Sequence, residues 1–196
     1  PFEQGLYGSF EMFVNGFLEL YKQGILRRKV YGDVTLQRLL NEGKITEAVT
    51  PALLEALVVH EAVHPQLSPA DVAYLQKFGV LRDDVKLVDH HLHTADGLAI
   101  EADLADDAAL RQINMHCLGR TLKGGILMHG GFFLGPRSFY DALNAMSEEQ
   151  NKLIGMTTVD NVNHLYGNQV LKALQRKDGR FINTCLMVTL SGGIVS

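Results

Sequence analysis

The pattern of apolar positions near the start of the chain is typical of an amphipathic helix. Apolar side chains recur there at the i, i+3, i+4, i+7 spacing of one helical face, at Phe10, Phe13, Val14, Phe17, Leu18 and Tyr21. Ser9 is suited to the N-cap and Gly24 to the stop. The spacing predicts a helix from residue 10 to about residue 21, with Glu11 in its first turn.

The next part of the chain, residues 33–122, has mostly helical patterns. We expect one helix to end near Gly43 and others to cover residues 46–64, 69–79 and 107–118. The third of these helices begins with Ser68 at the cap and Pro69 at its first position. The alternating runs 85–93 and 98–104 flank Asp96-Gly97, which is a hairpin signal. This block is therefore predicted to be mostly helical with a β-hairpin.

Strands and helices alternate over the rest of the chain. The glycine-dense run 124–135 predicts a buried strand, and Pro136 begins a helix at 137–146. Strands at 153–159 and 181–190 flank a helix at about 168–175. Such alternation is typical of a parallel sheet. The predicted fold class is α/β with a largely parallel sheet, plus the helical and hairpin block.

The composition is that of a folded protein with a slightly acidic balance. The 196 residues are 46% apolar and 20% charged, which is the globular range. A net charge of -4 argues against nucleic acid or an anionic membrane as the main partner, and no apolar run reaches membrane-spanning length. Cys117 and Cys185 form no disulfide framework, so we expect buried thiols in a cytoplasmic protein.

One short motif has a metal-binding pattern. His60, Glu61 and His64 match HExxH, in which two histidines one helical turn apart bind zinc and the glutamate acts as a base. Pro65 disfavours the helical conformation at His64, and the sequence positions no third ligand. We therefore expect polar residues at a helix end and no metal, with a zinc-dependent hydrolase as the alternative. The histidines at 90–93 are interpreted as solvated side chains beside the hairpin.

Two parts of the chain resemble a known enzyme family. Residues 6–26, which contain Ser-Phe-Glu-Met-Phe around Glu11, resemble the stretch around the catalytic glutamate of the acetyl-CoA hydrolase/transferase family, of the 4-hydroxybutyrate CoA-transferase type. Gly-Phe-Phe-Leu-Gly-Pro at 131–136, Met-Thr-Thr-Val-Asp-Asn-Val-Asn at 156–163 and the run at 181–190 resemble successive segments of its C-terminal domain. The resemblance implies a CoA-transferase-like catalytic domain at residues 1–32 and 123–196, incomplete at both ends and inactive alone. Residues 33–122 would then be an insertion.

The resemblance also implies a mechanism and substrates. Glu11 would attack the thioester of an acyl-CoA, and a glutamyl-CoA thioester would form as the covalent intermediate. A second carboxylate then completes a transferase reaction, whereas water completes a hydrolase reaction. The helix N-terminus predicted at Glu11 would keep its carboxylate charged. The substrates are acyl-CoA and small carboxylates, with no tightly bound cofactor, and the family implies a homo-oligomer.

The resemblance assigns roles to three further residues. Asn163 aligns with an asparagine beside the family's active-site carboxylate, where its amide would orient Glu11 or the acyl group. Gly131 and Gly135 would line the pocket for coenzyme A, because glycine allows close approach of the backbone to a ligand. The non-catalytic alternative is an assembly module in which Glu11 only complements a helix dipole.

Overall fold

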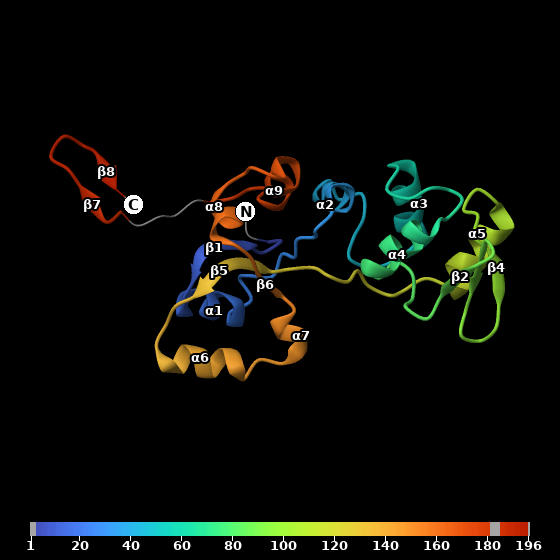
Figure 1. The fold of residues 1–196 in the computed structure, drawn as a ribbon, viewed down its shortest axis with the longest axis horizontal. Helices are drawn as coiled ribbons and strands as arrows, with labels where there is room; N and C mark the ends of the chain where they lie inside the picture. The colour runs from blue at the N-terminus through green and yellow to red at the C-terminus, as the bar shows by residue number, and fades with distance from the viewer. Residues whose placement is uncertain (1–2, 181–184, 196) are drawn as a thin grey trace.

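The computed structural model describes residues 3–180 and 185–195 of the chain. Figure 1 shows three parts in a row along the long axis: a hairpin, a body built on a parallel sheet, and a helical body. The structure thus combines helices with a small, largely parallel sheet, which agrees with the predicted α/β class.

The sheet of the central body has three strands in the order β1-β5-β6. Its strands are β1 (Gly8–Phe13), β5 (Met128–Phe133) and β6 (Ile154–Met156). Both pairings are parallel, with Gly8 opposite Met128 and Met128 opposite Ile154. The central strand is therefore the one that the glycine-dense run predicted.

Helices lie on both sides of this sheet (Figure 1). One side carries α1 (Asn15–Lys22), α6 (Arg137–Asn144) and the short α7 (Glu148–Asn151). The other side carries α8 (Val159–Asn163) and α9 (Gln169–Gln175). The predicted alternation of strand and helix is confirmed from β5 to α9, and Pro136 is the N-cap of α6. The last predicted strand does not join this sheet in the described residues, since β7 (Met187–Val188) pairs antiparallel with β8 (Ile194–Val195).

The predicted helix from residue 10 is wrong in its first half. Residues 8–13 form β1, and α1 begins only at Asn15, after an N-cap at Val14 that makes no side-chain hydrogen bond. The apolar spacing suggested one helix because Phe10 and Phe17 do pack together, with stacked rings 3.6 Å apart. They meet across the turn between β1 and α1. Glu11 is consequently a strand residue.

The helical body holds the predicted hairpin. It contains α2 (Val34–Asn41), α3 (Pro51–Val59), α4 (Pro69–Lys77) and α5 (Asp107–His116). Its antiparallel sheet consists of β2 (Lys86–Val88), β3 (His91–His93) and β4 (Ala99–Glu101), in that order. Gly97 in the β3–β4 turn has a φ of 86°, which favours glycine. The prediction of a mostly helical block with a hairpin is confirmed for these residues.

Buried apolar side chains form two clusters. One, in the parallel-sheet body, contains Phe13, Leu18, Leu26, Leu127, Met128 and Phe139. The other belongs to the helical body and extends along the chain from Tyr31 to Leu122. The chain enters the second cluster between Leu26 and Tyr31 and leaves it between Leu122 and Leu127. The division into a catalytic domain and an insertion at residues 33–122 stays a prediction, which the two clusters make testable.

Helix α4 begins at a capping box. The hydroxyl of Ser68 accepts a hydrogen bond from the backbone N–H of Asp71, and the Asp71 carboxylate accepts one from the backbone N–H of Ser68. Burial raises the pKa of Asp71, but hydrogen bonds from Ser68 and His64 outweigh burial and leave the pKa below its usual value. The ionised carboxylate therefore stabilises the fold above its unfolded pKa, and this stability is lost as the pH falls through the lowered folded pKa.

We expect Ser68→Ala to lower the free energy of unfolding by about 1 kcal/mol, because it removes the cap. The loss should be larger near neutral pH than in acid, where Asp71 is protonated. Chemical denaturation across this pH range measures it. Thr50→Ala is the matched control, since the Thr50 side chain caps α3 by accepting from the backbone N–H of Leu53, and the first turn of α3 contains no acidic residue. Equal pH dependence in the two variants would contradict the role of Asp71.

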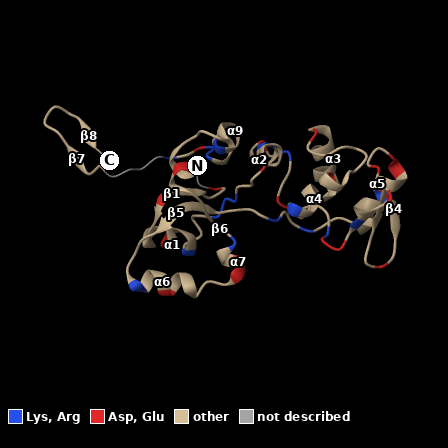
Figure 2. Ribbon diagram, in the orientation of Figure 1, with Lys and Arg blue, Asp and Glu red and all other residues tan. Residues whose placement is uncertain are grey.

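The third part is a hairpin of β7 (Met187–Val188) and β8 (Ile194–Val195). Residues 185–195 are all exposed, and Figure 2 shows no Lys, Arg, Asp or Glu on the hairpin. Of the predicted strand at 181–190, residues 181–184 lie outside the described residues. Cys117 is buried as predicted, whereas Cys185 is exposed because this hairpin stands away from the body.

In residues 3–180 and 185–195, every helix is too short or too polar to cross a membrane. The finding agrees with the lack of a long apolar run in the sequence.

Candidate functional site

The structure brings the two predicted site residues Glu11 and Asn163 together. The Asn163 side-chain amide donates a hydrogen bond from Nδ2 to Glu11 Oε2 at 2.9 Å, across 152 positions of sequence. Glu11 lies in β1, and Asn163 is the last residue of α8, a helix that packs on β1 and β5. The Thr158 hydroxyl caps α8 by accepting from the backbone N–H of Asn161 at 3.2 Å. Local capping thus fixes the helix that presents Asn163.

Gly131 lies beside Glu11 in the neighbouring strand. The register pairs Phe10 with Gly130 and Met12 with Phe132, so Gly131 falls opposite Glu11. A Cβ at position 131 would lie 2.9 Å from the backbone oxygen of Glu11 and 2.8 Å from Val159 Cγ2. The missing side chain therefore allows α8 to pack closely on the sheet at this point.

Gly135 has a different neighbour. A Cβ at this position would lie 2.5 Å from a ring carbon of Phe139 in α6. Phe139 is fully buried, so Gly135 makes room for core packing after β5. The predicted role of both glycines in binding coenzyme A stays a prediction, and only Gly131 adjoins Glu11.

We expect Gly131→Ala to destabilise the protein by about 1–3 kcal/mol, as overpacking does. Its Cβ would press on the backbone of Glu11, which cannot yield cheaply, and on Val159. The hydrogen bond between Glu11 and Asn163 should lengthen or break. Thermal unfolding and the NMR shifts of the Asn163 side-chain amide measure the two effects. Gly16→Ala is the matched control, because a Cβ there meets nothing within 4 Å; an equal loss in both variants would contradict the close approach.

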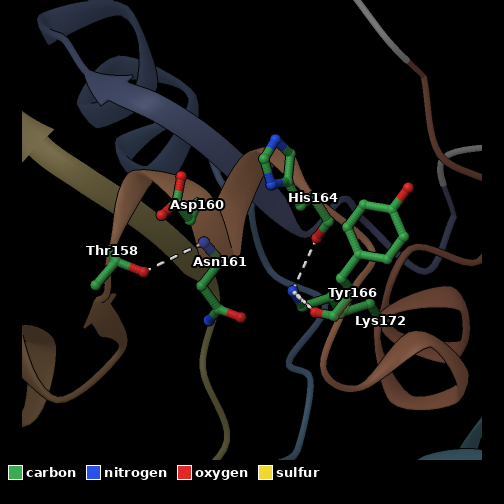
Figure 3. Close-up of a pocket in the computed structure, with 6 residues that line it drawn as sticks. All are labelled: Thr158, Asp160, Asn161, His164, Tyr166 and Lys172. Atoms are coloured by element: carbon green, nitrogen blue, oxygen red, sulfur yellow. Dashed lines mark hydrogen bonds between the residues drawn. The ribbon is translucent and has the colours of Figure 1, made fainter.

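A pocket of about 340 Å³ opens beside α8. Figure 3 shows the side chains that line it, which come from α8 and from the segment that leads into α9: Thr158, Asp160, Asn161, His164, Tyr166 and Lys172. Lys172 is buried, with 7% of its surface exposed. Its Nζ donates to the carbonyl oxygens of His164 at 2.8 Å and Tyr166 at 3.1 Å.

Little in the sequence indicates this pocket. Lys172 belongs to the helix expected at 168–175, where a lysine ordinarily faces solvent. The carbonyl groups that its ammonium contacts belong to His164 and Tyr166, eight and six residues earlier in the segment that connects α8 to α9. Only the capping pattern at Thr158 was a local signal, and it indicates a helix start rather than a site.

A second polar pair connects the residue before β1 to a residue of β5. The Tyr7 hydroxyl and His129 Nδ1 are 2.7 Å apart. Burial raises the pKa of Tyr7 and lowers that of His129, so both groups stay neutral near neutral pH. His129 pairs with Ser9 in the sheet, two residues before Glu11. The pair therefore fixes the strand that carries Glu11, in a place that sequence reasoning treated as apolar core.

The HExxH residues do not share a helical face. Helix α3 ends at Val59, where residues 46–64 had been predicted to be helical, and His60 is its C-cap. Glu61 has a φ of 56°, outside the helical region. His64 Nδ1 lies 3.2 Å from the Asp71 carboxylate. Among residues 3–180 and 185–195, no three His, Cys, Asp or Glu side chains gather in a way that could hold a metal ion.

Comparisons with known proteins identify no relative. No family model, no curated protein and no solved structure matches this chain.

Proposed function

We propose that this chain carries the nucleophile of an acyl-CoA:carboxylate CoA-transferase or an acyl-CoA hydrolase. The observation that supports the proposal is the 2.9 Å hydrogen bond from Asn163 to Glu11. The resemblance named these two residues as neighbours in a site, and nothing in the local sequence connects positions so far apart. A carboxylate and an amide in contact form a small polar site on the exposed side of β1.

In the proposed reaction, one Glu11 carboxylate oxygen attacks the thioester carbonyl of the acyl-CoA. The carbon–sulfur bond breaks, and an acyl-glutamyl anhydride and free CoA thiolate result. The thiolate then attacks the glutamyl carbonyl, which gives a glutamyl-CoA thioester and releases the acyl group as a carboxylate. A second carboxylate reverses these steps, or water hydrolyses the thioester. Covalent catalysis of this kind divides one difficult exchange into shorter steps.

Asn163 would orient the nucleophile. Its Nδ2 donates to Oε2, and within the described residues Oε1 has no hydrogen-bond partner, so Oε1 is available to attack. An ionised carboxylate needs no general base. The predicted contribution of a helix N-terminus is absent from the proposal, because Glu11 lies in β1 and α1 begins at Asn15.

The test is to trap the covalent intermediate. Because the resemblance implies that the chain is inactive alone, the full-length protein that carries it is incubated with acetyl-CoA, reduced with borohydride and digested, and the peptides are mapped by mass spectrometry. Borohydride converts a glutamyl thioester to an alcohol, and we expect this change at Glu11. The same treatment of Glu11→Gln and of a sample without acetyl-CoA supplies the controls. Absence of the product at Glu11, in protein shown by calorimetry to bind acetyl-CoA, would contradict the proposal.

A further inference from the structure

Lys172 is a buried cation with no ion-pair partner among the described residues. Only 7% of its surface is exposed, and in the described part of the chain no carboxylate forms a salt bridge with it. Buried charges ordinarily have a partner, because removal from water is costly. The two carbonyl oxygens that it contacts satisfy two of the three N–H donors of an ammonium group. One donor and the full charge remain for a ligand.

The walls of the pocket add polar groups around this ammonium. Figure 3 shows the Lys172 nitrogen between the loop that carries Tyr166 and the side of α8 that carries Asn161. Tyr166 is 76% exposed, and its hydroxyl points away from the Lys172 nitrogen (Figure 3). Its ring packs edge-on against His164 with 6.0 Å between centroids. The Asn161 amide is already engaged, since it donates to Thr157 Oγ1 at 2.8 Å. Asp160 is the one acidic side chain in the lining, and it opposes an anion.

We propose that this pocket binds the oxygens of a small anion, either a carboxylate or a phosphate, with Lys172 as the charged contact. Charge-assisted hydrogen bonds are the strong ones in such sites. A volume of about 340 Å³ is at the lower end of ligand pockets and suits a small acid or one phosphate group. The identity of the natural source rests on the proposed function: an acid substrate for a carboxylate, coenzyme A for a phosphate.

The experiment is an NMR titration of the full chain at low salt with two separate probes, inorganic phosphate and acetate. The shifts of the His164 imidazole and of the Lys172 backbone amide report binding. We expect Lys172→Met to weaken binding about tenfold or more, because it keeps the aliphatic stem and removes the charge. Lys152→Met is the matched control, since Lys152 lies on the opposite side of the sheet next to α7 and should leave binding unchanged.

Asp160→Asn provides a second test that does not depend on whether Lys172→Met folds. Asp160 is exposed in α8, and the loss of its charge should tighten anion binding about threefold to tenfold. Tighter binding in this variant is a gain that misfolding cannot produce. Saturation by acetate identifies a carboxylate site, and saturation by phosphate alone identifies a phosphate site; both outcomes support the proposal.

The proposal is overturned if neither probe binds to folded Asp160→Asn, or if binding is unaffected by both Lys172→Met and Asp160→Asn. Glu11→Gln separates this site from the proposed reaction. Anion binding should persist in that variant, whereas the trapped thioester should disappear. If the unsubstituted protein binds the anion but forms no thioester, the proposed anion site is supported and only the proposed role of Glu11 is contradicted.

Discussion

Glu11→Gln is expected to lower the turnover of acetyl-CoA by about 10⁴-fold or more, the scale typical of removing a nucleophile. Glutamine keeps the shape of the side chain and an oxygen that accepts from Asn163, but its amide cannot attack a thioester. Glu11 is exposed in β1, so the variant should fold normally. Release of free CoA in a steady-state assay, on protein that turns over acetyl-CoA, measures the loss.

Two variants show whether the effect belongs to the nucleophile. Asn163→Ala should lower turnover by about 10- to 100-fold, since it affects the orientation of Glu11 and not its chemistry. Glu19→Gln is the control, because Glu19 is an exposed acid on α1 whose contact is an ion pair with Lys22. If turnover in Glu11→Gln stays within a few-fold of the unmodified protein, Glu11 is no nucleophile and the assembly-module alternative is favoured.

The helices and hairpin with local signals could be predicted from the sequence. Ser68 and Pro69 define the start of α4 through contacts within one turn, and Asp96-Gly97 defines the β3–β4 hairpin in the same way. The prediction failed at β1, where apolar residues at helical spacing lie partly in a strand. The Phe10 and Phe17 rings are stacked 3.6 Å apart although Phe10 lies in β1 and Phe17 lies in α1. The spacing of apolar residues alone cannot distinguish one continuous helix from a strand that is followed by a helix.

The site depends on contacts that a local pattern does not contain. Glu11 and Asn163 meet because α8 packs on the sheet at Gly131, where the missing side chain makes room for Val159. Only the resemblance to a family suggested that pairing, since no spacing rule connects two positions 152 residues apart. The burial of Lys172 depends on the conformation of the segment between α8 and α9, whose carbonyl groups at His164 and Tyr166 it contacts. A composition of 18 basic and 22 acidic residues does not indicate which charged side chain is buried.

Phe13→Ala is expected to destabilise the parallel-sheet body by about 3–5 kcal/mol. Phe13 is fully buried, and its ring packs against Phe10, Phe133 and Phe139. Truncation leaves a cavity in the smaller of the two clusters, at the end of β1, the strand that also carries Glu11. Hydrogen exchange measures the free energy of opening at individual amides, so the cost can be assigned to each body separately. Amides of β1 and β5 should lose protection.

Leu57→Ala provides the reciprocal measurement. Leu57 is fully buried in the cluster of the helical body, and its truncation should cost about 2–5 kcal/mol there. If residues 33–122 form a unit that folds by itself, each variant lowers protection in its own body and spares the other. The bodies do touch, since Asn41 in α2 donates to the backbone oxygen of Leu174 in α9. Equal loss in both bodies from either variant would mean that this contact joins them into one cooperative unit, and the predicted insertion would then not be a separate domain.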